Sequence, residues 1–179
     1  RRQGATADGR AIADDRLVLA TGTAARHLPV PGIERPGVFS LRTIDDTLRL
    51  RPALDTARRI AIIGGGYIGL EAAAVFRSEG REVGVLEAED RVLKRVTGIA
   101  ISDFFQRYHA ERGVVLKLGA RAAAIEGEKR VTGVTLSDGT HLPADLVLNA
   151  TGARPNDDLA NAAGLACNDG ILVDAHART

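Results

Sequence analysis

Residues 58–87, which read RRIAIIGGGYIGLEAAAVFRSEGREVGVLE, constrain the fold of this chain more than any other stretch. Residues 58–63 form a short apolar run, rich in β-branched side chains, that ends at a glycine cluster, as expected of a buried parallel strand. From residue 67 to 79 the apolar positions repeat at helical spacing, and Gly80 follows where helices are commonly capped. Residues 81–87 resume strand character and end in an acid. The stretch therefore predicts one βαβ unit of an α/β fold.

The glycines of this unit follow the pattern G-x-G-x-x-G at Gly64, Gly66 and Gly69. The first glycine allows a tight turn, the second allows a pyrophosphate to approach the backbone, and the third allows close helix–strand packing. The free N–H groups and the positive end of the helix dipole then face the phosphates. Glu87 lies close to the expected ~20 residues further on, where a carboxylate accepts hydrogen bonds from ribose hydroxyls.

The residues after Glu87 bear on which dinucleotide would bind. They are Ala88, Glu89 and Asp90, with no Arg or Lys directly after Glu87 to hold a 2′-phosphate. Because the carboxylate itself repels that phosphate, the pattern favours NAD(H) over NADP(H). The competing interpretation is that the glycines form only a tight turn and that Glu87 is a solvated strand end.

Glu71 is a second acid close to the glycine pattern. We place it in the first turn of the helix, two residues after Gly69. One interpretation is local, because the helix dipole stabilises a carboxylate near the helix N-terminus. The other places Glu71 beside the nicotinamide end of the cofactor, and the residues alone leave both open.

Beyond this unit the sequence predicts another helix and several short strands. Apolar residues at helical spacing mark a helix around residues 101–108, and strand character resumes at residues 114–118. Residues 122–152 then alternate apolar and polar positions around Asp138-Gly139, a dipeptide that favours a tight hairpin turn. We therefore expect an antiparallel hairpin that leads into a buried strand.

The N-terminal part of the chain repeats this design. Residues 7–22 align without gaps on residues 137–152, so that matched positions lie 130 residues apart. The two copies end in Thr21-Gly22 and Thr151-Gly152. Ligands of doubly wound folds gather at the carboxyl ends of strands, so the matched endings favour a cofactor role for both. Because a glycine-rich βαβ unit precedes the second copy, we expect one before residue 1 as well.

Between the copies, residues 26–52 contain four of the six prolines and predict a crossing between domains followed by a short helix. We expect a domain boundary near residues 37–44. The absence of any methionine, including at position 1, leads us to expect that the chain is a piece of a longer one.

Composition excludes several classes of function. The 24 basic and 23 acidic residues give a formal net charge of +1, with no long run of one charge, which argues against nucleic acid or membrane as a partner. The single Cys167 excludes an internal disulfide framework and fits a reducing compartment, so we expect a cytoplasmic protein. The four histidines have no metal-like spacing, and we expect His109 to be a surface residue. We predict no metal site and no catalytic side chain.

Four stretches of the chain resemble a known family: IAIIGGGYIGLEAA, RVLKRVT, LPADLVLNATGARPN and LVLATGTAARHLPVPG. They are similar to the FAD-dependent pyridine-nucleotide (disulfide) oxidoreductases, which carry two dinucleotide-binding domains. RVLKRVT, residues 91–97, favours the NADH-dependent ferredoxin and rubredoxin reductase branch, which is typified by putidaredoxin reductase and biphenyl-dioxygenase reductase. The resemblance covers essentially the whole chain.

The resemblance implies an α/β, Rossmann-like NAD-binding domain, with a parallel sheet, helices and an antiparallel β-hairpin element, flanked by pieces of an FAD-binding domain of the same type. Residues 1–38 would end the first FAD-domain segment, residues 39–154 would form the NAD(H)-binding domain, and residues 155–179 would begin the second FAD-domain segment. The parent protein would transfer hydride from NADH to FAD and pass electrons to a ferredoxin or rubredoxin. The fragment alone is expected to bind NADH and little FAD.

The resemblance also implies which residues contact the cofactors. Glu71 would lie near the nicotinamide, Glu87 on the ribose, Arg95 toward the ribose-phosphate region and Gly152 against the nicotinamide. The residues of the glycine turn that would contact NAD(H) are Gly64, Gly65, Gly66, Tyr67, Ile68 and Gly69. Those that would contact FAD are Thr21, Gly22 and Arg26.

Two alternatives remain open at this point. One is a flavin-dependent disulfide reductase or NADH oxidase of the same fold, whose reactive cysteines would lie before residue 1. The other is a non-catalytic NAD-binding module that senses redox state.

Overall fold

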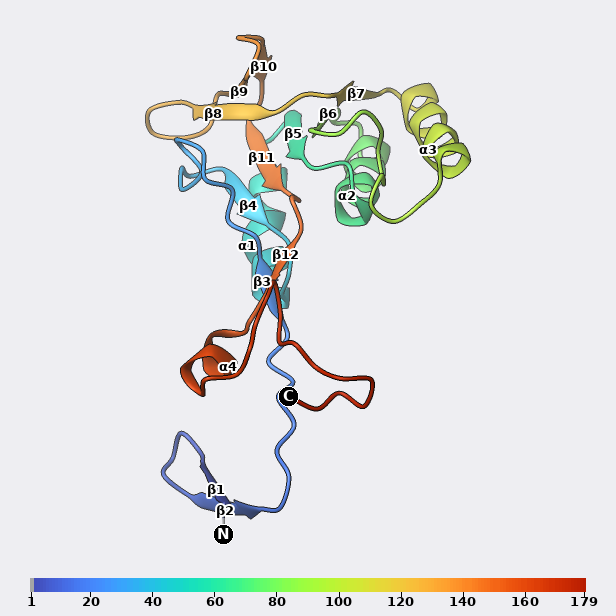
Figure 1. The fold of residues 1–179 in the computed structure, drawn as a ribbon. Helices are drawn as coiled ribbons and strands as arrows, with labels where there is room; N and C mark the ends of the chain where they lie inside the picture. Colours follow the sequence, from blue (N-terminus) through green and yellow to red (C-terminus); the bar gives the residue numbers. More distant parts are fainter. Residues whose placement is uncertain (1) are drawn as a thin grey trace. The chain divides into compact units, whose positions relative to one another are not determined.

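The computed structural model describes residues 2–179, and these residues divide into two compact units (Figure 1). Unit 2 comprises Ala25–Ala153, and unit 1 comprises the described residues up to Ala24 together with Arg154–Thr179. Residues 25–38, which the resemblance groups with the first FAD-domain segment, pack within unit 2.

Unit 2 is built around a five-stranded parallel sheet with the strand order β4-β11-β5-β6-β7. Its strands are β4 (Val38–Ser40), β5 (Arg59–Ile63), β6 (Glu82–Glu87), β7 (Val114–Leu118) and β11 (Leu146–Asn149). In the central strand β5, Ile62 pairs with Leu148 on one side and with Val85 on the other. All three side chains are at most 1% exposed, as expected of a parallel sheet that is covered on both faces.

Helices cover one face of this sheet, and a second sheet covers the other (Figure 1). The helices of unit 2 are α1 (Ile44–Leu54), α2 (Tyr67–Ser78) and α3 (Ile99–Glu111). Leu50 of α1 and Phe76 of α2 pack in the same cluster as Ile62, while Ala61 and Ile63 face the opposite way. Neighbouring residues of β5 thus enter two separate cores, because successive strand side chains point to opposite faces.

The second core lies under an antiparallel sheet of order β10-β9-β8. Its strands are β8 (Ala122–Glu126), β9 (Gly133–Leu136) and β10 (His141–Pro143). The hairpin between β9 and β10 turns at Gly139, whose φ is +84°, and the Asp138 carboxylate accepts a hydrogen bond from the Thr140 N–H at 2.8 Å. The predicted hairpin is confirmed, and its turn uses both residues of the Asp-Gly signal.

Unit 1 begins with a hairpin of β1 (Arg2–Ala5) and β2 (Ala11–Asp14), which turns at Gly9 with φ +82°. It also contains α4 (Asp158–Ala162). Residues 17–22 form no strand, and Leu17 and Val18 are 73% and 83% exposed. Within the described residues, the strand expected before Thr21-Gly22 therefore does not form.

Two short strands, β3 (Thr23–Ala25) and β12 (Ala153–Pro155), pair with each other, and the division between the units passes through both. In unit 2 the Arg26 N–H donates to the Gly152 carbonyl at 2.9 Å. In unit 1 the Asn156 N–H donates to the Gly22 carbonyl at 3.0 Å. The two donors, Arg26 and Asn156, lie 130 residues apart in the sequence, and so do the two acceptors, Gly22 and Gly152. The two hydrogen bonds thus keep the offset of the sequence repeat.

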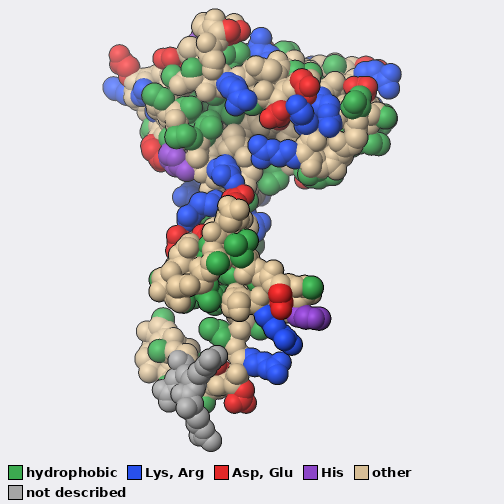
Figure 2. All heavy atoms as spheres, viewed as in Figure 1, with side chains coloured by type: hydrophobic (Ala, Val, Ile, Leu, Met, Phe, Trp, Pro, Cys, Tyr) green, Lys and Arg blue, Asp and Glu red, His purple; other side chains and the backbone are tan. Residues whose placement is uncertain are grey.

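Figure 2 shows basic, acidic and apolar side chains interspersed over the viewed surface of the chain. This mixture fits the near balance of 24 basic and 23 acidic residues. Several apolar side chains of α3 are among the exposed ones, including Ile99 at 67% and Phe104 at 50%. No helix among the described residues is long and apolar enough to cross a membrane.

Candidate functional site

The glycine turn between β5 and α2 is held by close backbone contacts. Gly64 has φ +113°, and a Cβ atom at this position would lie 2.4 Å from the Ala150 carbonyl oxygen. A Cβ atom at Gly69 would lie 2.0 Å from the Gly64 carbonyl oxygen. Because real Cβ atoms do not approach so closely, Gly64 is required by the approach of the backbone after β11, and Gly69 by the packing of α2 against the turn.

Gly66, the second glycine of the pattern, has a different environment. A Cβ atom there would meet no atom of the described chain within 4 Å. Gly66 is the N-cap of α2, no described side chain caps this helix end, and its first turn contains no acidic residue. The first N–H groups of α2 and the positive end of its dipole are therefore available to an anion.

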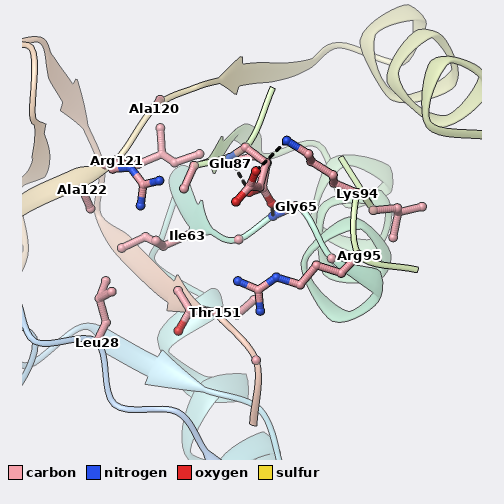
Figure 3. A pocket seen from close by; sticks show the side chains of 18 of the residues that line it. Leu28, Ile63, Gly65, Glu87, Lys94, Arg95, Ala120, Arg121, Ala122 and Thr151 are labelled. Carbon is pink, nitrogen blue, oxygen red and sulfur yellow. Dashed lines mark hydrogen bonds and ion pairs between the residues drawn. The ribbon is translucent and has the colours of Figure 1, made fainter. Parts of the chain in front are cut away.

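Glu87 lies at the carboxyl end of β6, beside this turn. Its carboxylate accepts one hydrogen bond from the Gly65 N–H at 2.7 Å and another from the Glu89 N–H at 2.9 Å, each on a different oxygen (Figure 3). A carboxylate oxygen accepts more than one hydrogen bond, so both oxygens keep capacity for the hydroxyl groups of a ribose. The two N–H groups fix the position of the negative charge.

A cavity of about 360 Å³ opens in front of the turn and lies wholly within unit 2. Its walls come from the carboxyl ends of β5, β6 and β11, where ligands of doubly wound folds bind, and from Leu28 and residues 93–96 and 120–122. The residues that line the cavity are Leu28, Ile63, Gly64, Gly65, Gly66, Tyr67, Leu86, Glu87, Ala88, Glu89, Leu93, Lys94, Arg95, Val96, Ala120, Arg121, Ala122, Ala150, Thr151 and Gly152. The volume falls within the range of ~300–1,000 Å³ that is usual for small-molecule sites.

The segment between β6 and α3 forms one wall of the cavity and is docked directly on the glycine turn. The Leu93 N–H donates to the Gly65 carbonyl at 3.0 Å. Leu93 is 3% exposed and has φ +56°, a left-handed conformation that is uncommon outside glycine. Val92 beside it is fully buried and packs with Leu70 of α2. The wall is therefore held rigidly against the turn.

Arg91 stabilises the segment between β6 and α3 through three hydrogen bonds. Its guanidinium donates to the Thr97 carbonyl at 3.0 Å, to the Ser102 hydroxyl at 2.6 Å and to the Lys94 carbonyl at 3.1 Å. Ser102, which is fully buried, donates in turn to the Val92 carbonyl at 2.6 Å. Sequence reasoning did not assign a role to Arg91, although the quoted stretch RVLKRVT contains it.

The cavity wall carries a charge cluster that the sequence did not reveal. Lys94 Nζ lies 2.9 Å from Glu89 Oε2 and 3.1 Å from Asp90 Oδ1. The hydrogen bond and positive charge of Lys94 lower the pKa of Glu89, with smaller contributions from the charges of Arg121 and Arg95. The same two acids raise the pKa of Lys94. A signal for Lys94 was present seven residues after Glu87, but Arg121 comes from a segment distant in sequence.

The structure brings together most of the residues predicted to contact NAD(H). The predicted residues that line the cavity are Gly64, Gly65, Gly66, Tyr67, Glu87, Arg95 and Gly152. Ile68 and Gly69 do not line it, and Gly69 instead packs against the turn. Glu71 does not line it either. The placement of Glu71 in the first turn of the helix is wrong, because α2 begins at Tyr67 and Glu71 is its fifth residue, with an exposed side chain.

The three residues predicted to contact FAD fall in different units. Thr21 and Gly22 belong to unit 1, where the Asn156 side-chain amide donates to the Thr21 carbonyl at 2.9 Å. Arg26 belongs to unit 2, and its guanidinium donates to the Ala153 carbonyl at 3.2 Å. The Arg26 carbonyl accepts a hydrogen bond from the Asn149 side chain at 2.9 Å, which joins it to the end of β11.

His109 is not the surface residue that its Arg- and Glu-rich surroundings predicted. Its side chain is 4% exposed and packs beside Phe105 and Tyr108. Burial lowers the pKa of the His109 imidazole, and the charge of Arg112 lowers it further. Among residues 2–179, no group of three or more His, Cys, Asp or Glu side chains is arranged to hold a metal ion.

Comparisons with known proteins agree with this geometry. The sequence model of the family described as pyridine nucleotide-disulphide oxidoreductase matches residues 1–179. The chain is 44% identical over 174 residues to the probable ferredoxin reductase CtmF of Castellaniella defragrans, which covers 97% of this chain and 42% of that protein. It is 42% identical over 185 residues to putidaredoxin reductase CamA of Pseudomonas putida, which covers 100% of this chain and 44% of that protein.

Among solved structures, the chain is similar to the covalent putidaredoxin reductase–putidaredoxin complex, with a TM-score of 0.89 and 42% identity. The match covers 98% of this chain and 44% of that chain. The chain therefore spans less than half the length of the relatives it matches.

Proposed function

We propose a function from one premise: the chain belongs to the pyridine nucleotide-disulphide oxidoreductase family. We propose that unit 2 contains the NAD(H)-binding part of a flavoprotein reductase, which transfers hydride from NADH to FAD and passes electrons to a ferredoxin or rubredoxin. Bound NADH and FAD would supply the redox chemistry, and this chain would bind and orient them. We assign no acid or base role to any side chain of the chain.

One observation carries the NAD(H) proposal. The open, uncapped N-terminus of α2 at Gly66 and the fixed carboxylate of Glu87 lie on the same cavity. The first suits a pyrophosphate, and the second suits the hydroxyls of the adenosine ribose. Gly152, which has φ +109° and open space at its Cβ position, would allow the flat nicotinamide to lie against the backbone.

The FAD proposal concerns the segments that flank the NAD(H) site. We propose residues 1–38 and 155–179 as parts of the FAD-binding domain and residues 39–154 as the NAD(H)-binding domain. Thr21, Gly22 and Arg26 are the proposed FAD contacts. Gly22 supports this proposal, because its φ of +69° and open Cβ position leave room for a ligand at the backbone.

The proposed partner follows from the relatives. The names of two similar proteins, a probable ferredoxin reductase and putidaredoxin reductase, support a ferredoxin or rubredoxin as the electron acceptor. The structure of putidaredoxin reductase joined to putidaredoxin supports the same class of partner. We propose a cytoplasmic location for the parent protein.

The proposal is tested by calorimetric titration of the intact protein with NADH and NADPH. We expect NADH to bind, and we expect Gly66→Ala to weaken binding at least tenfold, because its methyl group would occupy space needed by the pyrophosphate. The thermal midpoint of Gly66→Ala should stay close to that of the wild type, since the methyl group meets no atom of the described chain. Glu87→Ala should also weaken NADH binding. An absence of NADH binding, or of flavin absorbance in the intact protein, would contradict the proposal.

A further inference from the structure

We infer that Glu89 is a second determinant of dinucleotide selection, because it holds the Lys94 ammonium that would otherwise bind a 2′-phosphate. The inference rests on the proposed function, since it concerns the same cavity. On this inference the chain disfavours NADPH because the Lys94 ammonium in the cavity wall is already paired with the Glu89 carboxylate, and not because the cavity lacks a cation.

The geometry places Glu89 between the ribose-binding acid and the cation. The Glu89 N–H donates to Glu87 Oε1 at 2.9 Å, and the Glu89 carboxylate lies 2.9 Å from Lys94 Nζ. The Glu87, Glu89 and Lys94 residues all line the cavity. A phosphate on the ribose O2′ that Glu87 is proposed to hold would therefore be within reach of the Lys94 ammonium if Glu89 released it (Figure 3).

The backbone explains why Lys94 comes so close to Glu89. The segment after β6 turns back on the glycine turn through the Leu93 N–H to Gly65 carbonyl bond, and Leu93 adopts φ +56° to do so. Lys94 follows directly and is held by the donation of Arg91 to its carbonyl. The backbone from which the Lys94 side chain extends is thus held by this wall independently of Glu89.

The charge balance of the cavity makes Glu89 decisive. The described residues that line the cavity include two acids, Glu87 and Glu89, and three cations, Lys94, Arg95 and Arg121. Arg95 and Arg121 also act on Glu89, since their charges lower its pKa in addition to the effect of Lys94. Neutralising Glu89 therefore leaves one acid, Glu87, beside three cations in the cavity wall. A 2′-phosphate, which carries ~1.5 to 2 negative charges at pH 7, is the group that gains most.

The test compares NADPH and NADH binding to the intact protein by calorimetry, with Glu89→Gln as the main variant. Glutamine keeps the shape of the side chain and the backbone N–H that Glu87 accepts. We expect the ratio of the NADPH to the NADH dissociation constant to fall at least tenfold. The fall should shrink at high salt, because it depends on exposed charges. The double variant Glu89→Gln/Lys94→Gln should reverse most of the fall.

Asp90→Asn is the matched control. Asp90 contacts the same ammonium at 3.1 Å, but its side chain is 76% exposed and does not line the cavity. We therefore expect a much smaller change in the ratio than for Glu89→Gln.

The outcomes separate the inference from the proposed function. If the wild type binds NADH and Glu89→Gln leaves the ratio unchanged, the inference fails and the proposed function stands. If the ratio falls equally with and without Lys94, the role assigned to Lys94 is wrong. If the wild type binds neither dinucleotide, the proposed function fails, and the inference fails with it.

Discussion

The two copies of the sequence repeat, residues 7–22 and 137–152, start alike and end differently. In each copy an Asp-Gly dipeptide turns a hairpin, at Gly9 with φ +82° and at Gly139 with φ +84°. The following residues diverge: Leu148 is fully buried in β11, whereas Val18, its partner in the alignment, is 83% exposed. A hairpin is specified locally by its turn, but a buried strand exists only where neighbours such as β4 and β5 flank it.

The largest effect that would sharpen this comparison is expected at the matched pair Leu148 and Val18. Leu148→Ala should reduce the free energy of unfolding of this chain by about 2–5 kcal/mol, because it leaves a cavity between two layers. Val18→Ala should change it by less than about 0.5 kcal/mol. Urea unfolding of both variants measures the difference. Equal losses would show that the copies are equally packed and would remove the contrast.

A smaller effect is expected at Asp145 and its partner Asp15. Asp145 receives hydrogen bonds from the N–H groups of Arg58 and Arg59, and it pairs with the Arg59 guanidinium at 2.6 Å. The Arg59 side chain, followed by the two N–H groups, lowers the pKa of Asp145 to about 2. Because the Asp145 side chain is 27% exposed, we expect Asp145→Asn to cost about 1–2 kcal/mol at neutral pH. Asp15, which is exposed, should tolerate the same change.

The pH dependence of this pair follows from the lowered pKa of Asp145. The stabilisation is complete above the ordinary aspartate pKa of 3.8 and is lost as the pH falls through about 2. The stability difference between the wild type and Asp145→Asn should therefore be constant from pH 7 to 5 and should shrink below pH 4. A difference that persists unchanged at pH 2 would mean that the carboxylate charge is not its cause.

The smallest contrast is expected at the glycines that end the copies. Gly152 and Gly22 have φ of +109° and +69°, and neither Cβ position meets an atom within 4 Å. Gly152→Ala and Gly22→Ala should each cost about 1 kcal/mol of stability, because alanine disfavours these conformations. Thermal unfolding of both variants tests whether the copies share backbone strain although they differ in burial. A cost at only one glycine would break the resemblance between the two endings.

The sequence predicted the elements that depend on local signals. The βαβ unit at residues 59–87, the Asp138-Gly139 hairpin and the strand before Thr151 all form, because periodicity and turn residues act over short distances. The same signals did not show whether residues 17–22 have strand neighbours. They also did not show that His109 turns inward, since burial is decided by packing partners.

The candidate site was predicted in part for the same reason. Gly66 and Glu87 follow from spacing along one strand–helix–strand segment. The role of Lys94 depends on the left-handed backbone at Leu93, and the approach of Arg121 depends on a loop from a distant part of the chain. Neither leaves a periodic pattern in the sequence.

Two main-chain hydrogen bonds, one within each unit, keep the 130-residue offset of the sequence repeat and have an evolutionary consequence. The Arg26 N–H donates to the Gly152 carbonyl, and the Asn156 N–H donates to the Gly22 carbonyl. Since main-chain atoms make both bonds, mutation at positions 26 and 156 can replace either side chain and preserve the connection. Proline, which lacks the N–H donor, is the substitution that would break it. The side chains at positions 26 and 156 can therefore diverge in chemistry, as arginine and asparagine here already have, while each unit keeps its own main-chain bond.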